Sequence, residues 1–73
     1  MKVSYDSNVD AAYITLSDKK AYGAIEIEEG IVVHLTKENK LVSIEILDAS
    51  QKFDVHELLK FEVEDTQLVS VSS

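Results

Sequence analysis

Two carboxylates, Glu45 and Asp48, lie within and beside the most apolar run of the chain, residues 43–50. Two acids that face each other across a cleft can act as a general acid and a general base. The alternation of apolar and polar residues places Glu45 on the polar side of a strand, where it can pair with a Lys or His of a neighbouring strand. Asp48 follows that strand and is expected to end it by accepting hydrogen bonds from backbone amides. We therefore favour structural roles for both carboxylates over a catalytic pair.

The two histidines, His34 and His56, offer the nitrogen ligands that a metal site would use. No local spacing motif joins them to Glu45 or Asp48. The chain has no cysteine, and its two glycines form no phosphate-binding loop. We therefore expect a protein without a metal, a cofactor or enzymatic activity. The alternative is a small metal- or ligand-binding enzyme that uses Glu45, Asp48 and His34 at a subunit boundary.

Residues 6–10, with the sequence DSNVD, match the first half of an EF-hand calcium loop, which places oxygen ligands at alternate positions. The match then fails, because Ala11 stands where the loop needs glycine and Ser17 where it needs a bidentate acid. We expect a turn between two strands in which the side chain of Asp6 bonds its own backbone.

Composition excludes several classes of partner. The chain has 73 residues, 14 acids and 7 bases, and its net charge of -7 opposes binding to nucleic acid or to an anionic membrane. The N-terminal residues lack the apolar stretch of a signal peptide, and no apolar run approaches membrane-spanning length. We expect a soluble cytoplasmic protein whose acidic surface favours a basic protein partner.

Alternating patterns predict five strands, over residues 2–5, 11–16, 23–28, 31–36 and 41–47. Asp54 can cap a short helix, because Glu57 follows it with the spacing of a capping box. The expected class is α+β, an antiparallel β-meander of about five strands with one short C-terminal helix packed on it. Residues 1–63 are expected to form a single domain, and residues 64–73 a tail that is either an extra strand or partly disordered.

A chain this short buries only about 60 % of its unfolded surface, so a second copy is the simplest source of added stability. One helix leaves part of a face of the predicted sheet uncovered, and the second face mixes apolar residues with His34 and Glu45. A mixed face suits a homodimer interface better than open water does. The expected interface residues are Tyr13, Val32, His34 and Leu41.

Three segments together form a specific pattern, YDxxxDAxYIxL…EGI…IEILDAS, in residues 5–16, 29–31 and 44–50. This pattern resembles a family of small bacterial and phage proteins known as domain of unknown function 2283, over residue 1 to about residue 60. The resemblance implies a compact β-rich domain without assigned catalytic residues. Some relatives are encoded beside small toxin-like proteins, which implies an antitoxin-like or partner-binding role. The chain departs from the pattern at His34, where an acid is usual, and at Ser43, where glycine is usual.

The family pattern also suggests that the start of the second strand and the end of the fifth lie together. The polar cluster predicted on this basis contains Tyr5, Asp6, Asp10, Glu45 and Asp48. Such a cluster can hold strand ends together, or it can recognise a basic partner. Three hypotheses therefore stay open for the protein: an interaction module, a small enzyme with a site between subunits, and a structural homodimer without further ligand.

Overall fold

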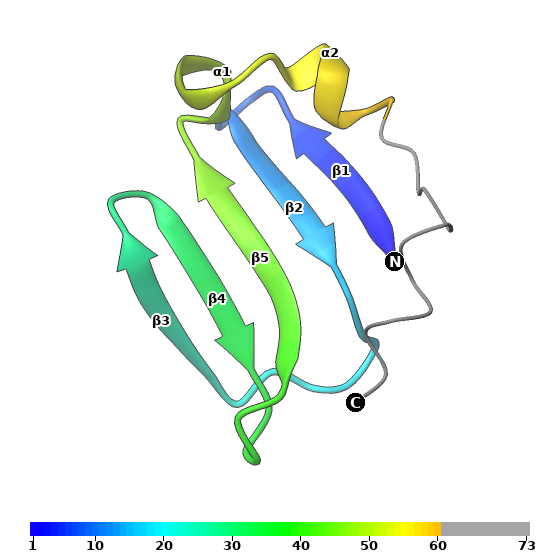
Figure 1. Ribbon diagram of the computed structural model, residues 1–73, viewed down its shortest axis with the longest axis vertical. Coiled ribbons are helices and arrows are strands. Elements are labelled where there is room, and N and C mark those ends of the chain that lie inside the picture. The colour runs from blue at the N-terminus through cyan, green and yellow to red at the C-terminus, as the bar shows by residue number, and fades with distance from the viewer. Residues whose placement is uncertain (61–73) are drawn as a thin grey trace, which may run out of the picture.

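The computed structural model describes residues 1–60, which form a five-stranded antiparallel sheet and two short helices (Figure 1). The elements are β1 (Lys2–Asp6), β2 (Ala11–Thr15), β3 (Gly23–Glu28), β4 (Ile31–Leu35), β5 (Leu41–Leu47), α1 (Ala49–Lys52) and α2 (Val55–Leu58). The predicted α+β class is therefore confirmed, with two helices in place of one. The predicted domain end at residue 63 and the predicted tail over 64–73 lie outside the described residues.

The strands follow the order β1-β2-β5-β4-β3, and every neighbouring pair is antiparallel. Three pairs are joined by short turns, as in a meander. The remaining connection, residues 16–22, passes along one end of the sheet and carries the chain from β2 to the far edge (Figure 1). This crossing leaves room for β5 between β2 and β4.

The register of the strands separates an apolar face from a polar face. Residues directly opposite one another in an antiparallel pair project from the same face. Ile14 lies opposite both Val3 and Ile44, and the same row continues to Val33 and Ile25. With the adjacent row, the apolar face contains Val3, Tyr5, Ala12, Ile14, Ile25, Ile31, Val33, Ile44 and Ile46. At the edge of this row, a register shift in β3 places Glu28 opposite Ile31.

The polar face carries a central row formed by Ser4, Tyr13, Glu45, Val32 and Glu26. Of the predicted interface residues, Tyr13, Val32 and His34 share this face, as the alternation predicted. Leu41 lies opposite Leu35, beyond a register shift that follows His34, and is 47% exposed.

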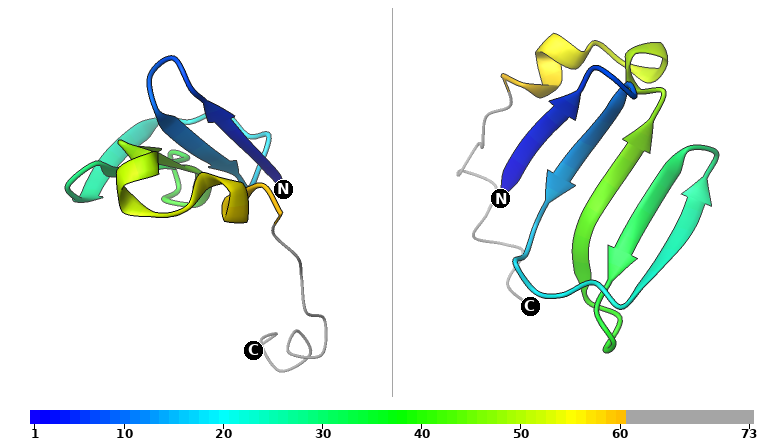
Figure 2. Two further views of the ribbon diagram at one scale, coloured as in Figure 1. Left: turned by 90° about the horizontal axis from the view of Figure 1, so that it is seen from above. Right: turned by 180° about the vertical axis from the view of Figure 1, so that it is seen from behind.

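Within residues 1–60 the buried apolar residues are small: Ala11, Ala12, Val42 and Ala49. No large side chain of this part of the chain is fully buried. The two helices lie along one end of the sheet rather than over its centre (Figure 2). Most of the aliphatic side chains on the apolar face are therefore half exposed among the described residues.

Candidate functional site

Asp10 is the centre of a hydrogen-bond network that joins three segments of the chain. Its Oδ1 accepts a hydrogen bond from the Tyr5 hydroxyl at 2.7 Å and another from the Ser50 backbone N–H at 3.0 Å. The Ser50 hydroxyl donates to Oδ2 at 2.8 Å, and the Asp10 carbonyl accepts from the Ala49 N–H at 2.9 Å. The Asp10 network therefore fastens β1 and the β1–β2 turn to the start of α1.

These hydrogen bonds shift two pKa values in opposite directions. Donation from Tyr5 and Ser50 holds the pKa of Asp10 below its ordinary value, because the hydrogen bonds stabilise the carboxylate. The same bond raises the pKa of Tyr5, because losing the phenolic proton would break the bond and place two negative charges together. At neutral pH the network consists of an ionised Asp10 and a protonated Tyr5.

Backbone geometry brings the parts of the network together. Asp10 and Asp48 both adopt the left-handed conformation, each with φ of 52°. Aspartate tolerates this region better than most residues. The left-handed turn at Asp48 ends β5 and directs Ala49 and Ser50 towards Asp10.

The expectation that the Asp48 side chain would accept backbone hydrogen bonds is wrong, because that side chain forms no capping hydrogen bond. The backbone conformation of Asp48 ends the strand instead. Its carbonyl oxygen accepts a hydrogen bond from Gln51, within the first turn of α1.

The predicted turn after β1 is confirmed, because Asp6 Oδ1 accepts a hydrogen bond from the Asn8 N–H at 2.9 Å. This bond forms the Asx turn expected of Asp6. Asp6 therefore orders the turn that contains Asp10 through the bond that its carboxylate accepts from Asn8.

Glu45 lies on the polar face and bonds to a different group of residues. Its Oε1 is 3.3 Å from His34 Nε2, which confirms the expected pairing with a cross-strand His or Lys. Tyr13 lies directly opposite Glu45. Burial, and then the charge of Glu45, raise the pKa of the Tyr13 hydroxyl. The predicted cluster therefore divides into Tyr5 with Asp10, and Glu45 with His34 and Tyr13.

Ser50 is the member of the Asp10 network that the sequence did not assign to the cluster. It is 40 positions from Asp10, and it donates through both its backbone and its side chain. The signal available was its place at the end of the IEILDAS segment, directly after the strand that carries Glu45.

The hydrogen bonds of the Asp10 network join groups of the chain itself. Both carboxylate oxygens of Asp10 accept hydrogen bonds from the chain itself. Among residues 1–60, no group of three or more His, Asp and Glu side chains is placed to hold a metal ion.

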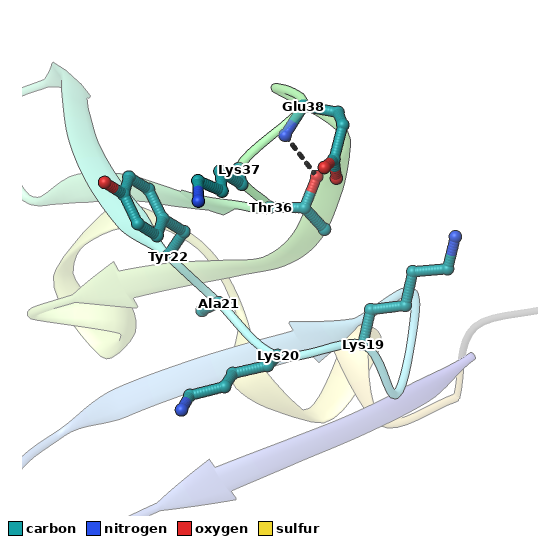
Figure 3. A pocket seen from close by; sticks show the side chains of 7 residues that line it. All are labelled: Lys19, Lys20, Ala21, Tyr22, Thr36, Lys37 and Glu38. Atoms are coloured by element: carbon teal, nitrogen blue, oxygen red, sulfur yellow. Dashed lines mark hydrogen bonds between the residues drawn. The ribbon is translucent and has the colours of Figure 1, made fainter.

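A shallow hollow lies at the opposite end of the sheet, between the β2–β3 connection and the β4–β5 hairpin (Figure 3). The ammonium of Lys37 lies 5.7 Å from the centre of the Tyr22 ring, a cation–π distance. Lys19 and Lys20 extend in different directions, away from the middle of the hollow (Figure 3). Because these ammonium groups do not converge, the hollow is a basic surface rather than a pocket for one anion.

Charge is divided between the two ends of the sheet. The basic end contains five lysines, Lys2, Lys19, Lys20, Lys37 and Lys40, with two acids, Asp18 and Glu38. The acidic end, where β1 and β5 terminate, contains seven acids and two lysines among residues 1–60. Its acids are Asp6, Asp10, Glu28, Glu29, Asp48, Asp54 and Glu57, and its lysines are Lys52 and Lys60.

In the part of the chain that the structure describes, no helix is long and apolar enough to cross a membrane. Comparison with known proteins finds no significant match among curated proteins or among solved structures. The profile of one family, described as "Protein of unknown function (DUF2283)", matches residues 2–50. This range holds the whole sheet and ends at Ser50, the residue that completes the Asp10 network. Because the match covers more than half of the 73 residues, the chain belongs to the DUF2283 family.

Proposed function

We propose that the protein is a non-enzymatic protein-interaction module that acts as a homodimer, with the apolar face as the surface between the two copies. The observation that carries this proposal is that residues 1–60 leave the apolar face without a covering layer. A sheet with one apolar face is stable only when another layer buries that face.

The exposure of the aliphatic side chains supports this role. Ile25 is 53% exposed, and Val33, Ile44 and Ile46 are only half-buried. Monomeric proteins rarely expose a contiguous apolar surface of this kind, and such surfaces commonly mark interaction sites. A 73-residue chain buries only about 60 % of its unfolded surface alone, so burial against a partner would add to its stability.

The division of charge favours a second copy as the partner. Two apolar faces can stack with their strands nearly aligned. If the two-fold axis runs across the strands, the basic end of each copy lies over the acidic end of the other. If the axis runs along the strands, like-charged ends meet. The reversed arrangement is therefore favoured, since complementary charge fixes orientation at an interface.

The surplus of acids supports a further partner with basic character. The acidic end has seven acids against five lysines at the basic end, so negative charge remains after the two copies pair. An antitoxin-like inhibitor of a basic protein is the most concrete form of this role. Its complex would weaken as salt rises, because salt screens exposed charges. Affinity capture at low and high salt, read by mass spectrometry, measures that dependence.

Val32 and Val33 provide a matched test of the dimer. They are neighbours in β4, both are half-buried, and they project from opposite faces. Val33→Asp would place a charge in the proposed interface, which costs several kcal/mol, whereas Val32→Asp would place the same charge on the polar face. Sedimentation equilibrium is expected to show a dimer for the wild type and for Val32→Asp, and a weakened or absent dimer for Val33→Asp.

The reverse pattern would contradict the proposal. A monomer with Val32→Asp and a dimer with Val33→Asp would place the interface on the polar face, with Tyr13 and His34. If Val33→Asp fails to fold, the double reversal Lys37→Glu and Lys40→Glu tests the same dimer without altering the sheet. That variant is expected to dimerise more weakly, and unchanged dimerisation would count against the reversed arrangement.

A further inference from the structure

We infer that the outer edge of β3 is a strand-addition site, which binds an extended segment of a basic partner protein in which apolar and basic residues alternate. This inference rests on the proposed function, because it identifies where the basic partner would bind. It adds the site, the conformation of the bound segment and its sequence character.

The exposure of β3 is the first observation. β3 is an edge strand of the sheet (Figure 1), and all six of its residues are exposed. In β1, at the other edge, three of five residues are half-buried. Proteins usually protect edge strands with lysine, proline or very short strands. β3 has six residues with neither lysine nor proline, and its protective features are two glutamates and a register shift between them.

The open backbone edge supplies the affinity for a strand. An edge strand presents N–H and C=O groups that can pair with an added strand, and pockets for alternate side chains then supply specificity. From Gly23 to Glu26, before the register shift, the side chains of β3 alternate in the way this mode requires. Ile25 projects from the apolar face, opposite Val33, and Glu26 projects from the polar face, opposite Val32.

This alternation defines the sequence that would pair with β3. An added antiparallel strand would place its residues on the same face as those that they oppose. An apolar residue would meet Ile25, and a lysine or arginine would meet Glu26. Beyond the register shift, Glu28 lies opposite Ile31 and adds a second negative charge at this edge. The Glu26 side chain is already oriented, because its Oε2 accepts a hydrogen bond from the Gly30 N–H at 2.9 Å.

The same charges disfavour a second copy at this edge. Pairing of β3 with the β3 of another copy would bring four glutamates together along one seam, and β3 contains no lysine to offset them. Like charges across a strand pair are destabilising. The edge therefore fits a basic segment better than it fits itself.

Short peptides test the inference directly. We would titrate isotope-labelled full-length protein with a heptapeptide of alternating lysine and isoleucine, and follow the backbone amides by NMR. The controls are a heptapeptide of alternating glutamate and isoleucine, and a lysine–isoleucine peptide whose central amides are N-methylated. The expected result is that only the first peptide binds, with the largest shift changes in the amides of β3.

Two charge-reversal variants test whether the basic peptide binds at the acids of β3 or at acids elsewhere on the protein. Glu28→Lys is expected to weaken binding of the basic peptide by about tenfold at low salt. Glu57→Lys reverses an equally exposed acid in α2, and is expected to leave binding within about twofold.

Three results would overturn the inference. They are equal binding of the N-methylated peptide, shift changes centred on α1 and α2 instead of β3, and equal loss of affinity in the two variants. None of them affects the dimer, which the Val32 and Val33 variants test separately. If no basic peptide binds to any part of the protein, both the basic partner and the β3 site are ruled out. The proposed dimer is not affected by that result.

Discussion

Asp10 shows how one side chain connects distant segments of a very small protein. Local chemistry predicts the turn that contains it, since Asp6 and Asn8 are typical turn residues. The contact with Ser50 was not predicted, because it depends on how the chain turns at Asp48, 38 positions later. Alternation did predict that Glu45 pairs across strands, and His34 is the partner.

Asp10 has two roles, because its backbone adopts a positive φ and its carboxylate accepts hydrogen bonds. Two substitutions separate these roles. Asn keeps the preference for positive φ, whereas Ala loses both that preference and the acceptor oxygens. We expect both variants to be less stable than the wild type, and Asp10→Ala to be the less stable of the two. Thermal unfolding followed by circular dichroism measures the difference. Equal stability of the wild type and both variants would show that the network contributes nothing to the fold.

The two pKa shifts in the Asp10 network predict how stability depends on pH. The lowered pKa of Asp10 means that its ionised form stabilises the fold. That contribution is present above the unfolded pKa, about 3.9, and is lost as pH falls through the lower folded value. The raised pKa of Tyr5 means that its protonated form stabilises the fold. That contribution is present below about pH 10 and is lost as pH rises further.

Urea unfolding across a pH series tests these signs. Asp10→Asn is expected to flatten the loss of stability on the acid side, and Tyr5→Phe the loss on the alkaline side. If Asp10→Asn loses as much stability at acid pH as the wild type, the acid-side loss is not due to Asp10. If Tyr5→Phe loses as much stability at alkaline pH as the wild type, the alkaline-side loss is not due to Tyr5.

At the scale of elements, the sequence predicted the strands but not their order. Alternation locates each strand to within one or two residues, because it reports which residues face the same side. It carries no information about which strands pair, so the position of β5 between β2 and β4 could not be derived. The cap of α2 was predicted, and Asp54 Oδ1 accepts the His56 N–H at 3.0 Å. The separation of α1 from α2 follows from extended backbone at Phe53.

The two glycines provide a matched test of turn geometry. Gly30 has φ of 77° in the β3–β4 turn, and an added Cβ would meet the flexible ammonium of Lys52 at 2.7 Å. Gly23 has nothing within 4 Å of such a Cβ. We expect Gly30→Ala to destabilise the protein by about 1–2 kcal/mol, mainly through its backbone conformation. Gly23→Ala should be neutral or stabilising by about 0.5 kcal/mol. Equal effects in chemical denaturation would contradict this explanation.

At the scale of the whole molecule, the proposed dimer depends on the two faces of the sheet and on the charges at its two ends. The sequence predicted one apolar and one mixed face, and from these we expected the mixed face to form the dimer. We propose the apolar face instead, because the helices lie along the end of the sheet and leave that face uncovered within residues 1–60 (Figure 2). Side-chain alternation alone could not reveal this, since it does not tell where a helix packs.

The reversed arrangement of the two copies predicts a distance. The chain has no cysteine, so single Asn8→Cys and Glu38→Cys variants can carry spin labels at the acidic and the basic end. In a reversed dimer, two labels at residue 8 lie far apart, at a distance comparable to the 38 Å length of the molecule. Dimers that mix the two variants should show a much shorter distance. A short distance between two labels at residue 8 would show that like ends meet.

The mass of the protein in solution tests the central claim most directly. Sedimentation equilibrium of the wild type, Val33→Asp and Val32→Asp compares one charge on the two faces of β4. The proposed interface predicts twice the 8.1 kDa chain mass for the wild type and Val32→Asp, and a shift towards a single chain mass for Val33→Asp. A wild type of single chain mass at all concentrations, or a dimer unaffected by Val33→Asp, would contradict it.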